Sequence, residues 1–279
     1  MSPDRSLSAR AGQALHAAAG DAVVVRSPVA PLNAEPRVSA MQTSQALAGH
    51  ALAVDSRDGD WLRVRGADDY AGWMHAGYVM DPAAALGDAG AGWYHGCEIS
   101  LECAVRGPHG RRMLPVGAIL LPGERCESGD VIGAAACPER FPPRAEAVVE
   151  TARRAFEGTS YQWGGITPWG ADCSGLVQSA FGLHGVPLPR DAWQQALEGE
   201  SAGEDPTALA AGDLLFFSDR EDGRVTHVGI AAGRGRMVHL ALGRGGYAVD
   251  RLDDGADPYV AMLRRNFRLA RRVAEAAGD

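Results

Sequence analysis

The sequence contains no lysine, and all 27 of its basic residues are arginines. Without lysine no Schiff base can form on a side-chain amine, which excludes pyridoxal-phosphate enzymes and lysine-dependent aldolases. The phosphate-binding loop, the lysine-anchored kinases and the serine–lysine acyl-transfer sites are excluded for the same reason. Any covalent catalysis must therefore use another nucleophile.

Long apolar runs are also missing. No stretch of about 18 apolar residues occurs, so we expect no membrane-spanning helix. The start of the chain is polar, and its first apolar stretch, Ala17 to Val25, is broken by Gly20 and Asp21. A secretory signal needs a continuous apolar segment, so we expect a cytoplasmic protein unless a signal has been removed.

Basic charge is in deficit, because 35 acidic residues against 27 basic ones give a net charge of −8. This balance argues against a nucleic-acid partner, which would require a basic face. The apolar fraction of 46% and the charged fraction of 22% are typical of a globular chain. A length of 279 residues alone predicts about two domains. The sequence defines no oligomeric state, and we expect a monomer.

Cysteine is scarce and unevenly placed. Cys97, Cys103, Cys126 and Cys137 are clustered, whereas Cys173 stands apart. No Cys-x-x-Cys pair is present, which disfavours a zinc site, so we expect no metal. Two disulfides or four reduced thiols remain open for the cluster, and reduced thiols are the usual state in the cytoplasm.

The order of short apolar runs and turns predicts an α+β protein with three units. Residues 22–80 contain strand-like segments such as Trp61-Leu62-Arg63-Val64-Arg65, and residues 93–131 have a similar texture, with strands expected at 97–101 and 113–121. Helical spacing follows at 146–156, and a second helix begins near Cys173 and ends before Gly185. Strands are then expected at 214–217, 227–231, 236–240 and 247–249.

The chemistry centres on a thiol at a helix start. Cys173 follows a loop and opens the second helix, where outward N–H groups and the helix dipole are expected to lower the pKa of the thiol. His227 and His239 lie on successive predicted strands. If these strands pair, His239 can hold the ring nitrogen of His227 that does not face Cys173, as an Asp or Asn does in other triads.

Six segments occur in order and at plausible spacing, and they carry a specific resemblance: Tyr161-Gln162-Trp163-Gly164-Gly165, Asp172-Cys173-Ser174-Gly175-Leu176-Val177, Pro189-Arg190-Asp191, Gly212-Asp213-Leu214-Leu215-Phe216-Phe217, His227-Val228-Gly229-Ile230 and Met237-Val238-His239. Residues 144–265 resemble the NlpC-type bacterial cell-wall cysteine peptidases, distant relatives of papain. Gly59-Asp60-Trp61 and Gly72-Trp73 resemble bacterial SH3-like domains. We therefore expect SH3-like domains at 15–82 and 83–140 and a papain-like peptidase domain at 141–270.

The resemblance implies a role for each matching residue. Cys173 corresponds to the nucleophile, His227 to the general base and His239 to the orienting third residue. Tyr161 corresponds to the tyrosine that helps to bind the oxyanion beside the Cys173 N–H. No metal or organic cofactor is implied. We expect core packing for Trp163, Trp169 and Trp193, although the last two could instead line the groove.

Substrate binding is also implied by the resemblance, which is strongest to the γ-D-glutamyl-L-diamino acid endopeptidases. Asp191 matches an aspartate that reads the amine of an N-terminal L-Ala, but Ala192 stands where those relatives usually have serine. Glu35 and Tyr70 are candidates for the acid and tyrosine lent by the first SH3-like domain. Each has a plainer alternative, a solvated loop charge for Glu35 and barrel surface for Tyr70.

The residues on either side of the nucleophile leave further alternatives open. Asp172 and Ser174 could contact the D-glutamyl portion of a substrate, and Asp172 could equally be a helix N-cap. Arg190 could pair with a carboxylate of the peptide or with an internal acid.

The main hypothesis is a cysteine peptidase that hydrolyses the γ-D-Glu–diamino acid bond of free murein peptides with N-terminal L-Ala, in cell-wall recycling. An exported hydrolase acting on the intact wall, a non-catalytic peptide-binding module and another acyl transfer, such as amidase or transglutaminase chemistry, are the alternatives.

Overall fold

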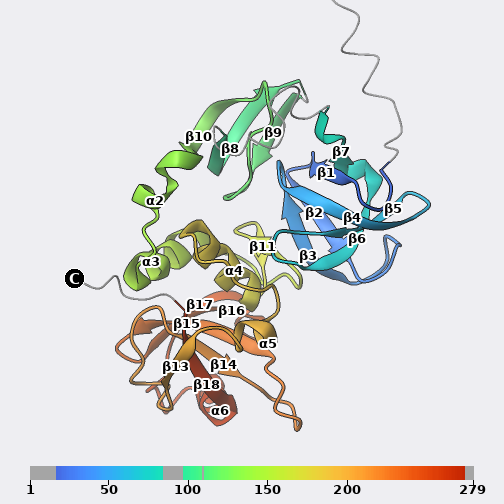
Figure 1. Cartoon of the computed structure of the whole chain (residues 1–279). Helices are drawn as coiled ribbons and strands as arrows, with labels where there is room; N and C mark the ends of the chain where they lie inside the picture. Colours follow the sequence, from blue (N-terminus) through green and yellow to red (C-terminus); the bar gives the residue numbers. More distant parts are fainter. Residues whose placement is uncertain (1–16, 84–96, 109, 274–279) are drawn as a thin grey trace, which may run out of the picture.

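The computed structural model describes residues 17–83, 97–108 and 110–273. Its first part, here called the N-terminal barrel, is a seven-stranded antiparallel sheet with the order β3-β2-β6-β5-β4-β1-β7. In Figure 1 this barrel is drawn in blue and cyan. Its strands are β1 (Ala22–Val25), β2 (Val29–Asn33), β3 (Gln42–Leu47), β4 (Ala51–Asp58), β5 (Trp61–Arg65), β6 (Ala71–His75) and β7 (Val79–Met80), with the short 3-10 helix η1 (Ala76–Tyr78) before β7.

The core of the N-terminal barrel follows from alternation along its strands. In β5, Leu62 and Val64 are buried while Arg63 and Arg65 face solvent, because successive side chains of a strand point to opposite faces. The buried set includes Val23, Leu32 and Met74 from three other strands. A single apolar core therefore fills the barrel.

A second part, here called the middle unit, is a three-stranded antiparallel sheet with the order β10-β8-β9. Its strands are β8 (Glu98–Gly107), β9 (Gly110–Leu114) and β10 (Arg125–Gly133), followed by η3 (Ala134–Ala136) and α2 (Cys137–Arg140). The expected strand at 113–121 is wrong beyond Leu114, because Pro115 has no N–H to continue the ladder. The start of the middle unit, residues 84–96, lies outside the described residues, as do residues 15 and 16.

The middle unit packs closely against the N-terminal barrel. Leu47 of the barrel shares one buried cluster with Cys103 and Leu114, and Val24 shares another with Cys97. These shared apolar contacts join the two β units into one block.

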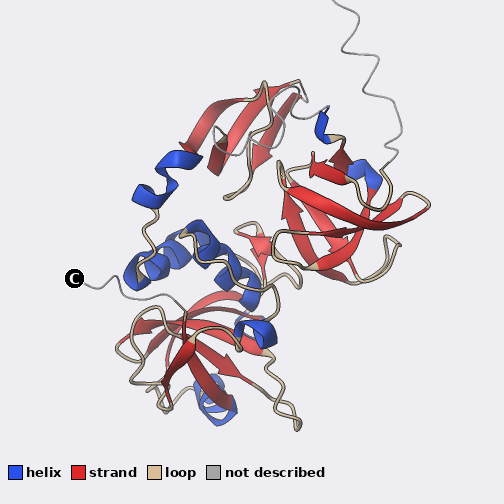
Figure 2. Ribbon diagram, in the orientation of Figure 1, coloured by secondary structure: helices blue, strands red, loops and turns tan. Residues whose placement is uncertain are grey.

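The C-terminal unit combines helices with a six-stranded antiparallel sheet of order β13-β18-β14-β15-β16-β17 (Figure 2). This is the α+β arrangement expected from the sequence. Its elements are α3 (Ala145–Phe156), β11 (Ile166–Thr167), β12 (Gly170–Ala171), α4 (Cys173–Leu183), α5 (Ala192–Gln195), β13 (Glu200–Gly203), β14 (Leu214–Phe217), β15 (His227–Gly233), β16 (Arg236–Ala241), η4 (Leu242–Arg244), β17 (Gly246–Arg251), α6 (Pro258–Asn266) and β18 (Phe267–Arg272).

The sheet of the C-terminal unit is covered on both faces. Leu214 and Phe216 of β14 join the buried cluster beneath α3 and α4, whereas Leu215 and Phe217 join a second cluster with α6. The predicted helices and the four predicted strands are present, and the additional elements include β11, β12, α5, β13, α6 and β18. Because both faces are buried, the central strands are fixed in position relative to the start of α4.

Three side chains of β3 connect the N-terminal barrel to the loop that precedes α4. Gln42 Nε2 donates to the Trp163 carbonyl at 3.0 Å, and Gln45 Oε1 accepts from the Ile166 N–H at 3.1 Å. Ser44, between them, accepts from Arg190 of the C-terminal unit. Figure 1 shows β11 lying beside this strand. The barrel is therefore in contact with the segment that leads to Cys173.

Candidate active site

Cys173 is the first residue of α4, and Asp172 caps that helix. The Asp172 Oδ1 accepts from the Gly175 N–H at 2.8 Å, as an N-cap side chain does. The other carboxylate oxygen accepts from the Gly164 N–H at 2.8 Å. Because the cap and the preceding loop are joined in this way, the thiol is held at a fixed helix start.

Arg190 also supports the start of α4. Its guanidinium donates to Asp172 Oδ2 at 2.7 Å and to Ser174 Oγ at 2.8 Å, and the Arg190 side chain is 1% exposed. Its Nε donates to Ser44 Oγ of the N-terminal barrel at 3.1 Å. Arg190 therefore pairs with an internal acid. These contacts favour the N-cap alternative for Asp172 and engage Ser174 within the protein.

His227 and His239 lie side by side on β15 and β16, which pair antiparallel. His227 Nε2 and His239 Nδ1 are 2.8 Å apart, so Nδ1 is the ring nitrogen of His227 that this contact leaves available. The Val228 N–H, next along β15, hydrogen-bonds the Cys173 sulfur. A Cβ at Gly229 would lie 2.5 Å from the Met237 sulfur and 3.2 Å from the His239 Cβ, so glycine makes room for both of these β16 side chains.

One acidic side chain behind the histidines was not singled out from the sequence. Asp250 Oδ2 lies 3.0 Å from His239 Nε2, and Asp250 is also bonded by Arg244. Its place depends on the β16–β17 register, in which Met237 faces Asp250. No local motif marks it, although its position on the strand after His239 was a usable signal.

The expected lowering of the Cys173 pKa is wrong. Burial raises the pKa of Cys173 to about 12, and the nearby Asp172 charge raises it further, while the Val228 N–H and Arg190 lower it. Burial also lowers the pKa of His227 to about 3, with a further lowering by His239. Desolvation disfavours both charged forms and exceeds the helix-start effect, so the resting pair is a thiol and a neutral imidazole.

Two tyrosines lie close to the sulfur. Burial raises the pKa of Tyr161, and the Cys173 charge raises it further, so its hydroxyl remains a hydrogen-bond donor at all ordinary pH values. The pKa of Tyr259 is likewise raised by burial, and its ring centroid is 6.3 Å from that of His239. Tyr259 was not predicted, because it comes from α6.

Among the predicted substrate-binding residues, Asp191 and Tyr70 are brought together. Tyr70, on the barrel, has its pKa raised by burial and then by the charge of Asp191, and its side chain hydrogen-bonds Thr43. Asp191 N-caps α5 and accepts from Trp193 Nε1 at 3.2 Å. An acid and a tyrosine from different units thus face the same region.

Glu35 is not brought to this region by any described contact. Its carboxylate pairs with Arg37 at 3.0 Å, and its side chain is 59% exposed. This geometry fits the alternative of a solvated loop charge. Ala192, at the position where relatives usually have serine, is buried beside α4.

The expected core packing of three tryptophans is wrong. Trp163 is 58%, Trp169 44% and Trp193 36% exposed. Trp169 Nε1 donates to Glu102 of the middle unit at 3.0 Å, and Arg224 lies over the Trp193 ring at 4.8 Å. The indole N–H groups of Trp169 and Trp193 donate to carboxylates, which explains why these two rings remain at the surface.

The cysteine cluster takes no part in this site. None of the cysteines in the described residues forms a disulfide, and those residues hold no group of three or more His, Cys, Asp or Glu suited to a metal ion. No helix in the part of the chain that the structure describes is long and apolar enough to span a membrane.

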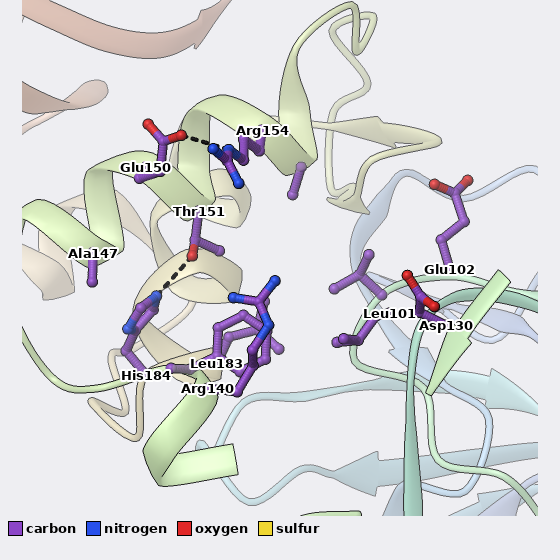
Figure 3. Close-up of a pocket in the computed structure, with 13 residues that line it drawn as sticks. Leu101, Glu102, Asp130, Arg140, Ala147, Glu150, Thr151, Arg154, Leu183 and His184 are labelled. Carbon is purple, nitrogen blue, oxygen red and sulfur yellow. Dashed lines mark hydrogen bonds and ion pairs between the residues drawn. The ribbon is translucent and has the colours of Figure 1, made fainter. Parts of the chain in front are cut away.

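A cavity of about 340 Å³ lies elsewhere, between the middle unit and α3 and α4. Figure 3 shows Glu102 and Asp130 on its strand side and Thr151 and His184 on its helix side. The predicted site residues do not line it, so it is distinct from the thiol site.

A buried thiol at a helix start, with a histidine pair on adjoining strands, defines the class of cysteine hydrolases. Residues 158–261 match the NlpC/P60 family, and residues 28–80 match the bacterial SH3 domain. The chain is 30% identical over 218 residues to a γ-D-glutamyl-L-lysine dipeptidyl-peptidase of Bacillus subtilis, covering 70% of this chain and 71% of that relative. The chain belongs to the NlpC/P60 family and is a cell-wall cysteine peptidase.

Other relatives share parts of the chain. A bifunctional muramidase/DL-endopeptidase CwlT of Bacillus subtilis is 45% identical over 86 residues, which are 30% of this chain and 26% of that relative. The crystal structure of an NlpC/P60 family protein from Bacillus cereus superposes with a TM-score of 0.75 and 20% identity, covering 91% of this chain and 100% of that chain. The latter likeness shows that the fold is shared along nearly the whole chain. An SH3 identity for the middle unit, and the domain boundaries, stay predictions.

Proposed function

We propose that this peptidase hydrolyses the γ-D-glutamyl–diamino acid bond of free murein peptides that begin with L-Ala, a reaction suited to cell-wall recycling. The match to the Bacillus subtilis relative spans 71% of that protein, whose name specifies a γ-D-glutamyl-L-lysine bond and the release of a dipeptide. Releasing a dipeptide requires a site that recognises a free N-terminus. The proposed cytoplasmic location stays a prediction.

The observation that carries the free-peptide proposal is the contact between the N-terminal barrel and the peptidase site. Ser44 bonds the arginine that supports the α4 cap, and Gln42 bonds the loop before it. Tyr70 of the same barrel lies within electrostatic reach of Asp191. A barrel docked here leaves less room for a polymeric strand than for a short peptide.

Asp191 and Tyr70 supply the chemistry for an amine. The Asp191 carboxylate accepts from Trp193 Nε1 and, in the capping box of α5, from the Gln194 N–H. Both donors are neutral and four lone-pair positions are available, so the carboxylate keeps capacity for a cation. A protonated amine paired with a partly buried carboxylate is a charge-assisted contact, stronger than a neutral hydrogen bond. The Tyr70 hydroxyl would orient the same amine.

The proposed reaction is an acyl transfer through a thioester. The Cys173 thiol proton passes to Nδ1 of His227 as the sulfur attacks the γ-carbonyl carbon of D-Glu. The oxyanion is bound by the Cys173 N–H and the Tyr161 hydroxyl. The diamino acid leaves with the proton from His227, and water, deprotonated by His227, then releases L-Ala-D-Glu and the thiol. Neither step requires a metal or an organic cofactor.

The test is hydrolysis of L-Ala-γ-D-Glu-diaminopimelate, followed by mass spectrometry of the products. Wild-type protein should release L-Ala-D-Glu and free diaminopimelate, and Cys173→Ala should release neither. Cys137→Ser removes another thiol, on α2 and away from the site, and should retain full activity. Cleavage by Cys173→Ala at the wild-type rate would overturn the proposed mechanism.

A further inference from the structure

Asp250 stands behind the histidine pair in a buried chain of hydrogen bonds. Its Oδ2 lies 3.0 Å from His239 Nε2, and His239 Nδ1 lies 2.8 Å from His227 Nε2. His239 is 0% and Asp250 8% exposed. Arg244 donates to both carboxylate oxygens, at 2.8 Å and 3.2 Å, so the carboxylate has a fixed orientation.

An ionised carboxylate can only accept hydrogen bonds, and this fixes the protons along the chain. His239 Nε2 must carry a proton to donate to Asp250. In the neutral ring His239 Nδ1 is then bare and accepts, so His227 Nε2 must carry the proton between the two rings. The nitrogen left without a proton is His227 Nδ1, the atom that takes the Cys173 proton in the proposed reaction.

We propose that Asp250 is a positioning residue: through His239 it selects the His227 tautomer whose bare Nδ1 accepts the Cys173 proton. The inference rests on the proposed function, in that His227 must be the proton acceptor. It assigns to Asp250 a task that neither histidine can perform, because two neutral rings alone would allow either direction of donation.

The Asp250 charge also acts on the imidazolium formed during attack. Its carboxylate raises the pKa of His227, whereas His239 lowers it. The other charged or titratable groups that face this chain are Arg244, its second partner Asp257, and Tyr259, whose ring lies 4.5 Å beneath the Arg244 guanidinium. A neutral residue in place of Asp250 removes one of the two carboxylates that balance the positive charge of Arg244. Protonated His227 then becomes less stable.

The tautomers can be read in the wild-type protein, without any substitution at Asp250. Long-range proton–nitrogen correlation spectra at pH 8, assigned with His227→Gln and His239→Gln, should show both rings neutral and protonated at Nε2. A proton on Nδ1 of either ring would overturn the proposal.

The kinetic test compares Asp250→Asn with Asp253→Asn. Asp253 follows β17 and pairs with Arg251 in an exposed ion pair. Asp253→Asn therefore removes the same charge as Asp250→Asn without a contact to the hydrogen-bonded histidines. Asp250→Asn should lower kcat/KM on the order of 10²-fold. Both limbs of its pH–rate profile should move by about one unit toward lower pH, because a negative charge that favours proton binding is lost.

Asp253→Asn should leave the rate and both limbs unchanged. A merely structural role for Asp250 would lower activity without moving the limbs, and that result would contradict the proposal. Failure here is distinguishable from failure of the proposed function. In the first case the wild-type protein cleaves the tripeptide and Cys173→Ala does not, whereas in the second the wild-type protein does not cleave it or Cys173→Ala cleaves it equally well.

Discussion

Cys173, His227 and Tyr161, the three side chains to which the proposed reaction assigns its chemistry, all have charged forms that burial disfavours. The thiol pKa is raised to about 12 and that of His227 is lowered to about 3. In the proposed reaction the proton therefore moves at the moment of attack, from sulfur to imidazole. The developing negative charge then lies on the carbonyl oxygen, where the Tyr161 hydroxyl is the proposed donor.

Replacing Tyr161 by Phe should lower kcat by about 10²-fold with little change in KM, because an oxyanion donor acts mainly in the transition state. Tyr247→Phe is the matched control, since Tyr247 is also partly buried but bonds Arg153. Steady-state kinetics on the free tripeptide checks this. Equal kcat values for the two variants would remove Tyr161 from the oxyanion site.

Sequence alone singled out the candidate residues whose neighbours carry a motif. Cys173 follows a loop and opens a helix, and the two histidines lie on strands with clear turns between them. Asp250 and Tyr259 were missed because their contact with His239 arises from β17 register and α6 packing. The direction of the Cys173 pKa shift was missed because it depends on how deeply the folded chain buries the thiol. The local sequence at a helix start does not reveal that burial.

At the scale of elements, one buried ion pair fixes the start of α4. Arg190 and Asp172 have side chains that are 1% and 7% exposed, and Asp172 at once caps α4 and bonds Gly164. Removing one partner of a buried pair leaves an uncompensated charge. The position of Cys173, the proposed nucleophile, and the stability of the unit thus depend on the same contact.

Arg190→Met should lower the free energy of unfolding by about 3 kcal/mol. Arg220→Met is the control, because Arg220 pairs with Asp222 at an exposed turn and should not shift the unfolding midpoint. Urea unfolding followed by circular dichroism measures both. Matching midpoints would show that the buried pair does not support the helix start.

At this scale the sequence predicted α3, α4 and strands β14 to β17. It missed β18, although Phe267-Arg268-Leu269-Ala270-Arg271-Arg272 partly alternates, because α6 runs directly into it without a turn signal. It also missed that β18 lies between β13 and β14. Long-range strand order depends on packing against both sheet faces, and no local pattern records it.

The whole molecule joins three units around one site. The N-terminal barrel and the middle unit share buried clusters, and β3 bonds the loop and the arginine that support Cys173. Tyr70 and Asp191 come from different units, so the amine pocket proposed here exists only when the barrel is docked. The barrel is then part of the proposed substrate site.

The central claim is most directly tested by kcat/KM for L-Ala-γ-D-Glu-diaminopimelate against the same peptide with its L-Ala amine acetylated. Acetylation removes the cation that Asp191 is proposed to bind, so we expect a loss of about 10²-fold or more. Asp191→Asn should lower cleavage of the free peptide and reduce this discrimination. Equal cleavage of free peptide, capped peptide and intact sacculi by the wild-type protein would contradict the account.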